Sequence, residues 1–170
     1  MLALAELIRD FVNTYEVEAD SDELGTPAEL AVWLRERELI GQADRATDDD
    51  LATAIALREG LRAALRGEAV IELPVLPLRV AFGVRPGLVP VAGGVAGGLA
   101  GIAAAVTDSS WDRLKVCAED SCQWAFVDSS RNRSRSWCSM RVCGNRTKTR
   151  AYRARKQGSR RLQRSNTDTV

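Results

Sequence analysis

Apolar residues near the start of the chain recur with the spacing of an α-helix. The residues at positions i, i+3, i+4, i+7 and i+11 are Leu4, Leu7, Ile8, Phe11 and Tyr15. This spacing places them on one face of a helix, as is typical of a helix that packs on a core. The pattern therefore predicts a first helix over residues 4–15, followed by a polar, acidic turn over residues 16–25.

Two further helices begin at clear N-terminal signals. Thr26 is followed by Pro27 and Glu29, which predicts an N-cap, a proline at the first helical position and a capping box. Thr47 precedes three aspartates, which would lie at the positive end of the helix dipole. Gly67 is expected to end this third helix. The residues expected to face the core are Leu30, Trp33 and Leu34 in the second helix and Leu51, Ala54, Ile55, Leu61 and Leu65 in the third.

The pattern changes after the third helix. Prolines exclude a helix over residues 73–77. Residues 78–82 and 88–92 are predicted to form short strands on either side of a turn at residues 85–87. Residues 93–106 are rich in Gly and Ala, and we expect them to form a helix.

The uncharged stretch of residues 86–107 leaves a membrane span open as an alternative for this region. Ala and Gly partition weakly into lipid, however, and Pro90 interrupts the stretch. We therefore expect the Gly/Ala helix to pack flat against the first three helices, and we predict no membrane partner. The same small residues would also suit a homodimer contact.

The two parts of the chain carry opposite charge. Residues 1–112 have 9 Arg and no Lys against 19 acids, a net charge of −10, whereas residues 113–170 have a net charge of +11. This asymmetry indicates modules with different roles, and a basic segment suits a polyanion such as nucleic acid. We expect an acidic helical domain over residues 1–112, a basic finger over residues 113–157 and a basic disordered tail over residues 158–170.

The four cysteines of the chain form two close pairs. Cys117 and Cys122, then Cys138 and Cys143, follow the spacing C-x4-C, with 15 residues between the pairs. Two such pairs are typical of a tetrahedral Zn(Cys)4 site, which is structural because no coordination position stays open. The chain has no histidine, so catalysis through a histidine base is excluded, and we expect no enzyme. Two disulfides in a secreted protein are the alternative, but no signal peptide precedes the first helix.

Alternating apolar residues follow the first cysteine pair. Residues 123–128 are predicted to form a strand with Trp124 and Phe126 on one face, and residues 135–137 a returning strand after a polar turn. Asn145 is a candidate N-cap for a helix over residues 146–157. This order of elements is that of a treble-clef-like finger, with a zinc ribbon as the alternative. The predicted fold is thus α+β and mostly helical: an N-terminal helical domain with a small β-hairpin, then a treble-clef-like Zn(Cys)4 finger.

The sequence of the finger resembles a known family. Residues 113–156 are similar to the CGNR zinc finger, whose name-giving tetrapeptide is Cys-Gly-Asn-Arg at residues 143–146. The N-terminal part resembles the ABATE domain at residues 10–14 (DFVNT), at the helix start over residues 26–34 and at residues 56–59 (ALRE). The resemblance implies a bacterial, stress-induced transcription regulator that binds one structural zinc ion per chain and, less directly, DNA.

Basic residues dominate the end of the chain. Residues 131–164 include 13 basic residues and no acid, a density that favours binding to double-stranded DNA. The candidate DNA-binding residues are Arg131, Asn132, Arg133 and Arg135 in the finger and Arg146, Lys148, Arg150, Tyr152, Arg153 and Arg155 in its helix. Thr147, Ala151 and Ala154 form a small face of that helix, which could pack against the finger hairpin.

The predicted function is a DNA-binding transcription regulator of the bacterial cytoplasm, associated with the nucleoid. The N-terminal domain would act as a sensor of an effector that the sequence does not specify, or as a dimerisation module. The alternative is an interaction adaptor whose basic finger binds RNA or an acidic protein, including its own N-terminal domain, because the opposite charges of the two parts favour such docking.

Overall fold

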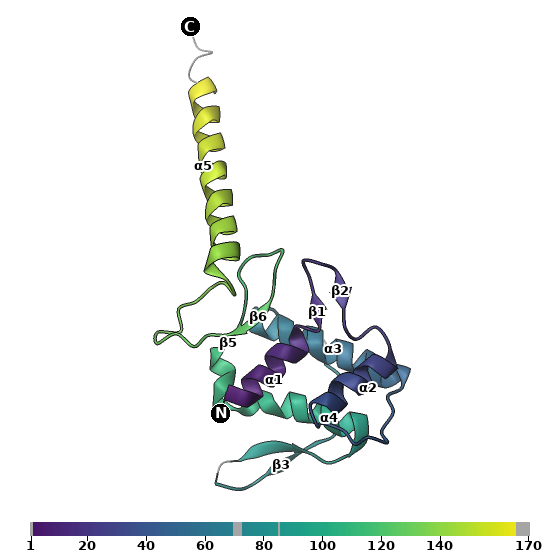
Figure 1. The fold of residues 1–170 in the computed structure, drawn as a ribbon. Coiled ribbons are helices and arrows are strands. Elements are labelled where there is room, and N and C mark those ends of the chain that lie inside the picture. The colour runs from purple at the N-terminus through teal and green to yellow at the C-terminus, as the bar shows by residue number, and fades with distance from the viewer. Residues whose placement is uncertain (1, 70–72, 85, 166–170) are drawn as a thin grey trace.

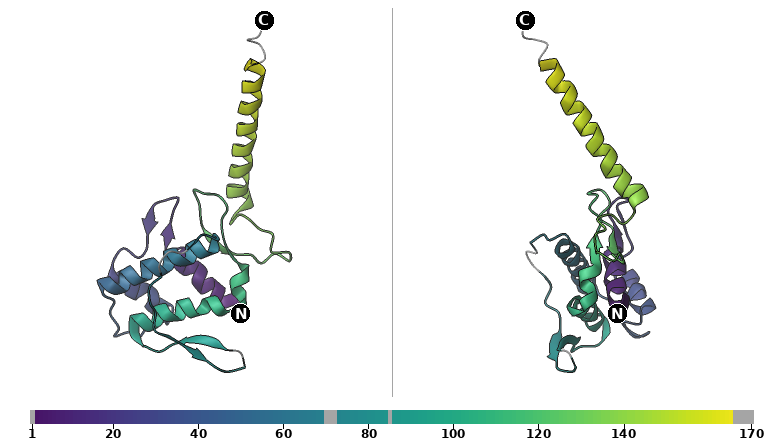
Figure 2. Two further views of the ribbon diagram at one scale, coloured as in Figure 1. Left: turned by 180° about the vertical axis from the view of Figure 1, so that it is seen from behind. Right: turned by 90° about the vertical axis from the view of Figure 1, so that its left-hand side faces the viewer.

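The computed structural model describes residues 2–69, 73–84 and 86–165. Within them, four α-helices lie together, and a fifth, α5 (Asn145–Ser165), projects away from the others in every view (Figures 1 and 2). The four are α1 (Leu2–Val12), α2 (Pro27–Glu36), α3 (Asp48–Leu65) and α4 (Gly94–Ala104). Two 3-10 turns, η1 (Ala105–Thr107) and η2 (Ser109–Arg113), follow α4, and a single π-turn, η3 (Met140–Gly144), precedes α5.

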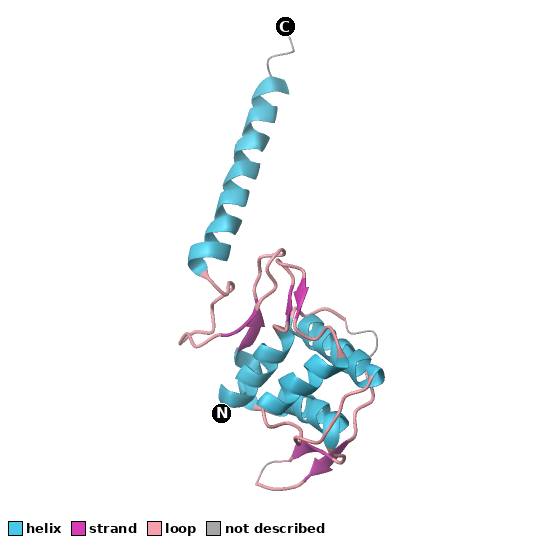
Figure 3. Ribbon diagram, turned by 45° about the vertical axis from the view of Figure 1, so that its right-hand side comes forward, coloured by secondary structure: helices cyan, strands magenta, loops and turns pink. Residues whose placement is uncertain are grey.

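The strands form separate antiparallel pairs rather than one sheet (magenta in Figure 3). The pairs are β1 (Tyr15–Glu16) with β2 (Ser21–Asp22), β3 (Leu78–Ala81) with β4 (Gly87–Pro90), and β5 (Leu114–Val116) with β6 (Ala125–Val127). A mostly helical α+β fold with small hairpins is therefore confirmed. The strands predicted at 78–82 and 88–92 are present as β3 and β4 with slightly different ends, and residue 85 of the turn between them lies outside the described residues.

The first helix is shorter than the sequence predicts. It ends at Val12, where the Thr14 hydroxyl donates a hydrogen bond to the Phe11 carbonyl (2.8 Å), and Tyr15 lies in β1. Ile8 and Phe11 are fully buried as expected, but Leu4 is 41% exposed. Val12, off the predicted face, is buried instead, because α1 is covered on several sides by α3, η1, η2 and β6.

The caps of α2 and α3 follow the sequence closely. The Thr26 hydroxyl accepts the Glu29 amide proton (3.3 Å) and donates to the Glu29 carboxylate, so this carboxylate contacts the hydroxyl rather than a backbone amide. Thr47 and Asp50 form a reciprocal capping box, in which each side chain accepts from the other backbone amide. Gly67 adopts φ +70°, its amide donates to the Ala64 carbonyl, and the Glu68 amide donates to the Ala63 carbonyl, as a Schellman cap requires.

Small residues let α4 enter the core, where it packs on α2 and α3, as predicted for these two helices, and on β4. Leu99 and Ile102 are fully buried, and a Cβ atom at Gly98 would lie 3.0 Å from the Ile40 side chain and 3.1 Å from the Leu39 carbonyl oxygen. At Gly97 it would lie 2.1 Å from a backbone oxygen, so Gly97 has no room for a side chain, and Gly98 would accept one only if its neighbours shifted. In the part of the chain that the structure describes, no helix is both long and apolar enough to cross a membrane.

The C-terminal finger shares its core with the helical body. Leu114 of β5 and Ala125 of β6 are buried in the same apolar cluster as Phe11 and Leu61. Asn13, at the end of α1, binds the backbone of Ala125 twice: its amide donates to the carbonyl (2.9 Å) and its side-chain oxygen accepts from the N–H (2.8 Å). The helical body and the finger are thus packed into one structure despite their opposite charges.

Two arginines of α3 are buried, although the sequence analysis assigned them no role. Arg58 is 3% exposed and donates to both carboxylate oxygens of Asp22 at 2.7 and 2.8 Å, and to the Thr14 hydroxyl. Arg62 donates to the carbonyl oxygens of Val12 (2.7 Å) and Tyr15 (2.9 Å). These contacts tie the end of α1 and the β1–β2 hairpin to α3.

A cavity in the core is expected to cost much of the stability of the body. Phe11→Ala should lower the free energy of unfolding by about 3–5 kcal/mol, because Phe11 is fully buried and its ring lies 5.3 Å from that of Trp33. Leu4→Ala, on the exposed side of the same helix, is the control and should change it by less than about 1 kcal/mol. Chemical denaturation followed by circular dichroism measures both, and equal effects would contradict the packing described.

The Arg58–Asp22 ion pair makes the stability of the folded protein depend on pH. The hydrogen bond from Arg58 holds the pKa of Asp22 below its ordinary value, so this contribution is present at neutral pH and is lost as the pH falls through that lowered pKa. Asp22→Asn should therefore cost only about 1–2 kcal/mol at pH 7, because the Asp22 side chain is 30% exposed and water screens the ion pair.

Denaturation curves of wild type and Asp22→Asn should approach each other as the pH falls below about 4. Glu16→Gln removes an exposed carboxylate of the same hairpin and serves as the control, with little effect at either pH. A gap between wild type and Asp22→Asn that stays constant down to pH 2–3 would show that the lowered pKa does not contribute.

Candidate metal centre and nucleic-acid interface

The first cysteine pair lies at the tip of the β5–β6 hairpin. The Cys117 amide donates to the Trp124 carbonyl (2.9 Å), which extends the β5–β6 ladder, and the Cys122 amide donates to the Glu119 carbonyl (2.9 Å), which closes the knuckle. The predicted hairpin between residues 123–128 and 135–137 is therefore wrong. Strand β6 pairs instead with β5, the strand before it. This pairing lets β6 pack on α1 and β5 pack on α3. Residues 135–137 contact the knuckle through one backbone hydrogen bond, in which the Ala118 amide donates to the Ser136 carbonyl (2.8 Å).

The second pair leads directly into α5. Cys143 belongs to η3, where the Ser139 hydroxyl accepts the Val142 amide proton (3.3 Å). A Cβ atom at Gly144 would lie 2.5 Å from the Met140 sulfur, so a side chain there would have to displace the Met140 side chain. Asn145 is not the predicted N-cap, because its backbone is already helical and its side chain donates to the Arg141 carbonyl. A knuckle at a hairpin tip, then a second pair at the start of a helix, is the order of a treble-clef-like finger rather than a zinc ribbon.

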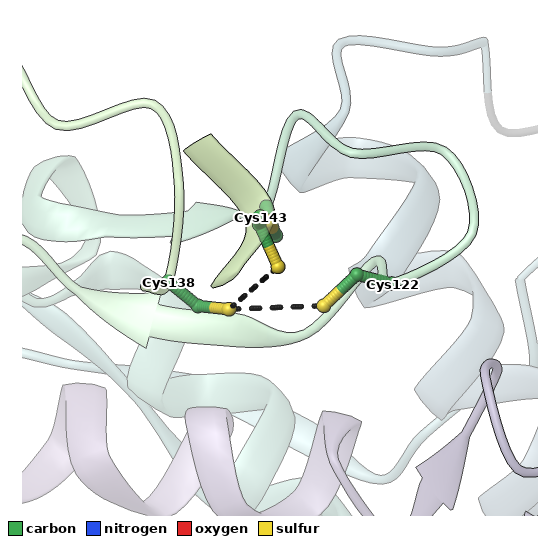
Figure 4. Close-up of side chains that lie close together, drawn as sticks. Cys122, Cys138 and Cys143 are labelled. Atoms are coloured by element: carbon green, nitrogen blue, oxygen red, sulfur yellow. Dashed lines mark hydrogen bonds between the residues drawn. The ribbon is translucent and has the colours of Figure 1, made fainter. Parts of the chain in front are cut away.

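The four cysteine sulfurs meet at one point. All four lie within 4.8 Å of one another, and Cys138 Sγ is 3.7 Å from the sulfurs of both Cys122 and Cys143 (Figure 4). A tetrahedral zinc ion with Zn–S bonds of about 2.3 Å needs sulfurs about 3.8 Å apart, so the donor set fits this ion. Cys117 and Cys143 are buried, and the other two are half-buried. The cluster can therefore hold a metal in a closed, all-sulfur site that leaves no position for a substrate.

The thiols differ in how readily they ionise without a metal. Burial raises the pKa of Cys122 to about 11 and raises that of Cys138 further. Burial also opposes ionisation of Cys117, but backbone amides of Glu119 and Cys138 stabilise its thiolate and lower its pKa. Because metal binding needs thiolates, a bound ion has to displace protons from this cluster.

A buried carboxylate joins the first knuckle to α5. Glu119 is 1% exposed, and its two oxygens accept hydrogen bonds from Arg150 (2.6 Å), Thr147 (2.9 Å) and Ser121 (3.1 Å). The hydrogen bond from Arg150 is the main cause that lowers the pKa of Glu119. Sequence analysis missed this residue, although an acid between two cysteines, in a segment with few acids, was a visible signal.

A second buried carboxylate shapes the loop after β6. Asp128 is fully buried and accepts from Lys115 Nζ (2.8 Å) and from the amides of Ser130 (2.9 Å) and Arg135 (3.0 Å). The ion pair with Lys115 is the main cause that holds the pKa of Asp128 far below its ordinary value. Lys115 also donates to the carbonyls of Arg133 and Arg135, so this pair fixes the loop that carries the arginines of the finger.

Comparison with known families separates the chain into the same two parts. The family model of the CGNR zinc finger matches residues 113–156. The model of the ABATE family, described as "putative stress-induced transcription regulator", matches residues 5–109, which is more than half of the chain. The chain belongs to the ABATE family. No curated protein gives a match to it.

The candidate DNA-binding residues of this ABATE protein divide into two groups. The first group already has protein partners: Arg133 pairs with Asp112 (3.7 Å), Arg135 donates to the Cys138 carbonyl (2.7 Å), Arg146 pairs with Glu18 (2.9 Å), and Arg150 pairs with Glu119. In the second group, Arg131, Asn132, Lys148, Tyr152 and Arg153 are exposed, with no side-chain hydrogen bond or ion pair to another described residue. Arg155 is exposed as well.

The helix of the CGNR finger departs from the sequence prediction. It extends to Ser165 instead of ending near residue 157, so the predicted disordered tail of residues 158–170 is helical in its first part, and residues 166–170 lie outside the described residues. The small face does not pack on the finger hairpin, because Ala151 and Ala154 are exposed and only Thr147 makes a contact there. The physical reason is that α5 projects outward, so its contacts are confined to its first turns.

Metal content is expected to decide whether the finger folds. We expect one Zn²⁺ per chain, because structural zinc sites contribute about 10–16 kcal/mol, which the few buried side chains of the finger cannot replace. Chelation should unfold residues 113–144 and also loosen α1, since Leu114 and Ala125 belong to the shared core.

Elemental analysis of protein purified under reducing conditions, with tryptophan fluorescence during chelation, measures these effects. Cys138→Ser should remove the metal and the response to chelator, whereas Ser136→Ala, on the neighbouring loop, should retain both. Disulfides in place of free thiols, or folded metal-free protein, would contradict the metal site.

Proposed function

We propose that this protein is a transcription regulator that binds double-stranded DNA through α5 and the loop of residues 129–135, with one structural zinc ion that holds the finger together. The observation that carries this proposal is a basic helix that projects from the body with its side chains exposed from Lys148 to Gln157. An α-helix fits the major groove of DNA, and no acid lies within residues 131–164 to repel phosphate.

The partners of the candidate residues suggest a division of labour within this interface. Lys148, Tyr152 and Arg153 are exposed on the helix and are available to contact bases or phosphates, and Arg155 is exposed on the same helix. Arg131, Asn132 and Arg133 lie in the loop, where phosphate is easier to reach than base edges. Arg146 and Arg150 are already bound to carboxylates, so their first role in this proposal is to hold the helix, and any contact to DNA is secondary.

The helical body would sense an effector or organise the regulator on DNA. It is acidic, so it would turn away from the duplex while α5 approaches it. A homodimer through α4 is not favoured, because that helix buries Val95, Leu99 and Ile102 within its own chain, and dimerisation would need another surface. A DNA-bound regulator would be found with the nucleoid in the cytoplasm.

An interaction adaptor is the second candidate function. The ion pair of Arg146 with Glu18 shows that the basic finger accepts a carboxylate of the acidic β1–β2 hairpin. A surface of this kind would also bind an acidic protein or RNA. Selection of bound sequences from a random duplex pool, with an RNA pool in parallel, separates the two candidates.

Binding to duplex DNA should weaken steeply with salt. Each phosphate contact contributes a slope of about −0.9 to log K against log salt concentration, so about five contacts would give a slope of roughly −4 to −5. Arg153→Ala should flatten the slope by about one contact, because this exposed side chain has no ion pair with a described carboxylate.

Arg45→Ala is the matched control, since it removes the same charge from an exposed loop before α3. Its slope should equal that of wild type if the interface lies on α5. Fluorescence anisotropy with a labelled duplex at several salt concentrations measures all three proteins. Folded, zinc-loaded protein without affinity for duplex at low salt would overturn the proposal and favour the adaptor.

A further inference from the structure

The direction of α5 depends on a few contacts in its first turns. Among the described contacts, Asn145, Arg146, Thr147 and Arg150 bond the first turns to the rest of the protein through their side chains, and every residue from 151 to 157 is exposed. A helix held at one end acts as a lever. At 1.5 Å rise per residue, the part beyond Arg150 is about 22 Å long, so a tilt of about 10° would move its far end by about 4 Å. Whatever fixes the first turns therefore decides where the basic side chains lie.

Glu119 is the buried residue through which these turns are fixed to the first cysteine pair, and Arg146 adds an exposed hydrogen bond to the Ser121 hydroxyl (3.3 Å). Its carboxylate is buried and accepts from both Thr147 and Arg150, which lie one turn apart on α5. Its carbonyl accepts the amide protons of Cys122 (2.9 Å) and Gln123 (3.2 Å). One residue thus binds the knuckle with its backbone and the helix with its side chain.

The other anchor of α5 is weaker. Arg146 pairs with Glu18 at 2.9 Å, but both side chains are substantially exposed, at 35% and 47%. An exposed ion pair of this kind adds little stability and gives the helix freedom to move. In the Arg150–Glu119 pair the arginine side chain is 59% exposed, but Glu119 is shielded from water. Its two oxygens accept from Ser121 of the knuckle and from Thr147 and Arg150 of α5.

We propose that Glu119 is a positioning residue: it transmits the geometry of the cysteine cluster to α5 and sets the direction in which the basic helix leaves the finger. Metal loading orders the knuckle, the knuckle holds Glu119, and Glu119 holds Thr147 and Arg150. The consequence for DNA rests on the proposed function, because a preorganised helix binds more tightly than one that has to be ordered on binding. The direction of the helix itself does not depend on that function.

Two matched variants separate positioning from charge. Glu119→Gln and Glu18→Gln each remove one negative charge that faces an arginine of α5, so both make the finger more basic by the same amount. If net charge alone determined affinity, both variants should bind duplex DNA more tightly than wild type. If Glu119 positions the helix, Glu119→Gln should instead weaken binding by about tenfold, with Glu18→Gln unchanged or slightly tighter.

The direction of α5 is measured without DNA. Residual dipolar couplings of the zinc-loaded, 18.5 kDa protein report the orientation of α5 relative to α1. In Glu119→Gln the couplings of α5 should be scaled down or reoriented while those of α1–α4 persist, with one zinc per chain retained. Thr147→Val removes one donor to Glu119 without changing any charge, and it should change the couplings of α5 in the same way but less. If Glu119→Gln does not fold, Thr147→Val provides the test.

Each outcome has a distinct meaning. Couplings of α5 that are the same in wild type and in the folded variants would overturn the positioning role, whatever DNA binding shows. Changed couplings, with no DNA binding by wild type, would support the positioning role and overturn the proposed function. Changed couplings together with weaker DNA binding in Glu119→Gln but not in Glu18→Gln would support both.

Discussion

Four thiols have to meet at one point before the C-terminal part of this chain has a defined shape. Few apolar side chains between residues 113 and 144 are buried, and two of them, Leu114 and Ala125, belong to the apolar core of the helical body. The cysteine cluster therefore determines where the hairpin ends, where η3 turns and where α5 begins. A closed tetrahedral site suits this task because it joins four distant points of the chain with strong bonds and no solvent-filled position.

The finger and the helical body share an apolar core although they carry opposite net charges. Opposite net charges suggest two separate modules, but apolar side chains and the paired hydrogen bonds of Asn13 with Ala125 join them, in addition to exposed ion pairs such as Arg146–Glu18. Long-range attraction between the parts is screened by salt, whereas burial and short hydrogen bonds are not. The asymmetry of charge is thus better related to outside partners, with the acidic body and the basic helix facing in different directions (Figure 2).

Arginine has three different roles in this protein, and its surroundings decide which. Arg58 and Arg62 are buried in the body, where they satisfy a carboxylate and free carbonyl groups at the end of α1. Arg150 and Arg146 hold the base of α5 through Glu119 and Glu18. Arg131 at the loop tip and Arg153 farther along α5 keep their charge exposed to solvent, where a polyanion can reach it. A count of basic residues therefore overestimates the surface available for nucleic acid.

The sequence by itself determined the features that depend on neighbours a few residues apart. Helical periodicity, the threonine caps before α2 and α3, Gly67 and the cysteine spacing act within one or two turns, so α1 to α4 and the composition of the metal site could be predicted. The tertiary structure alone decided features that depend on residues distant in the chain: the pairing of β5 with β6, the burial of Val12 and Arg58, and the bond between Glu119 and Arg150. Several partners are chemically equivalent for a carboxylate or a strand edge, and local pattern cannot select among them. The selection is made by burial, because only the packed chain shows which polar groups are cut off from water and must find each other.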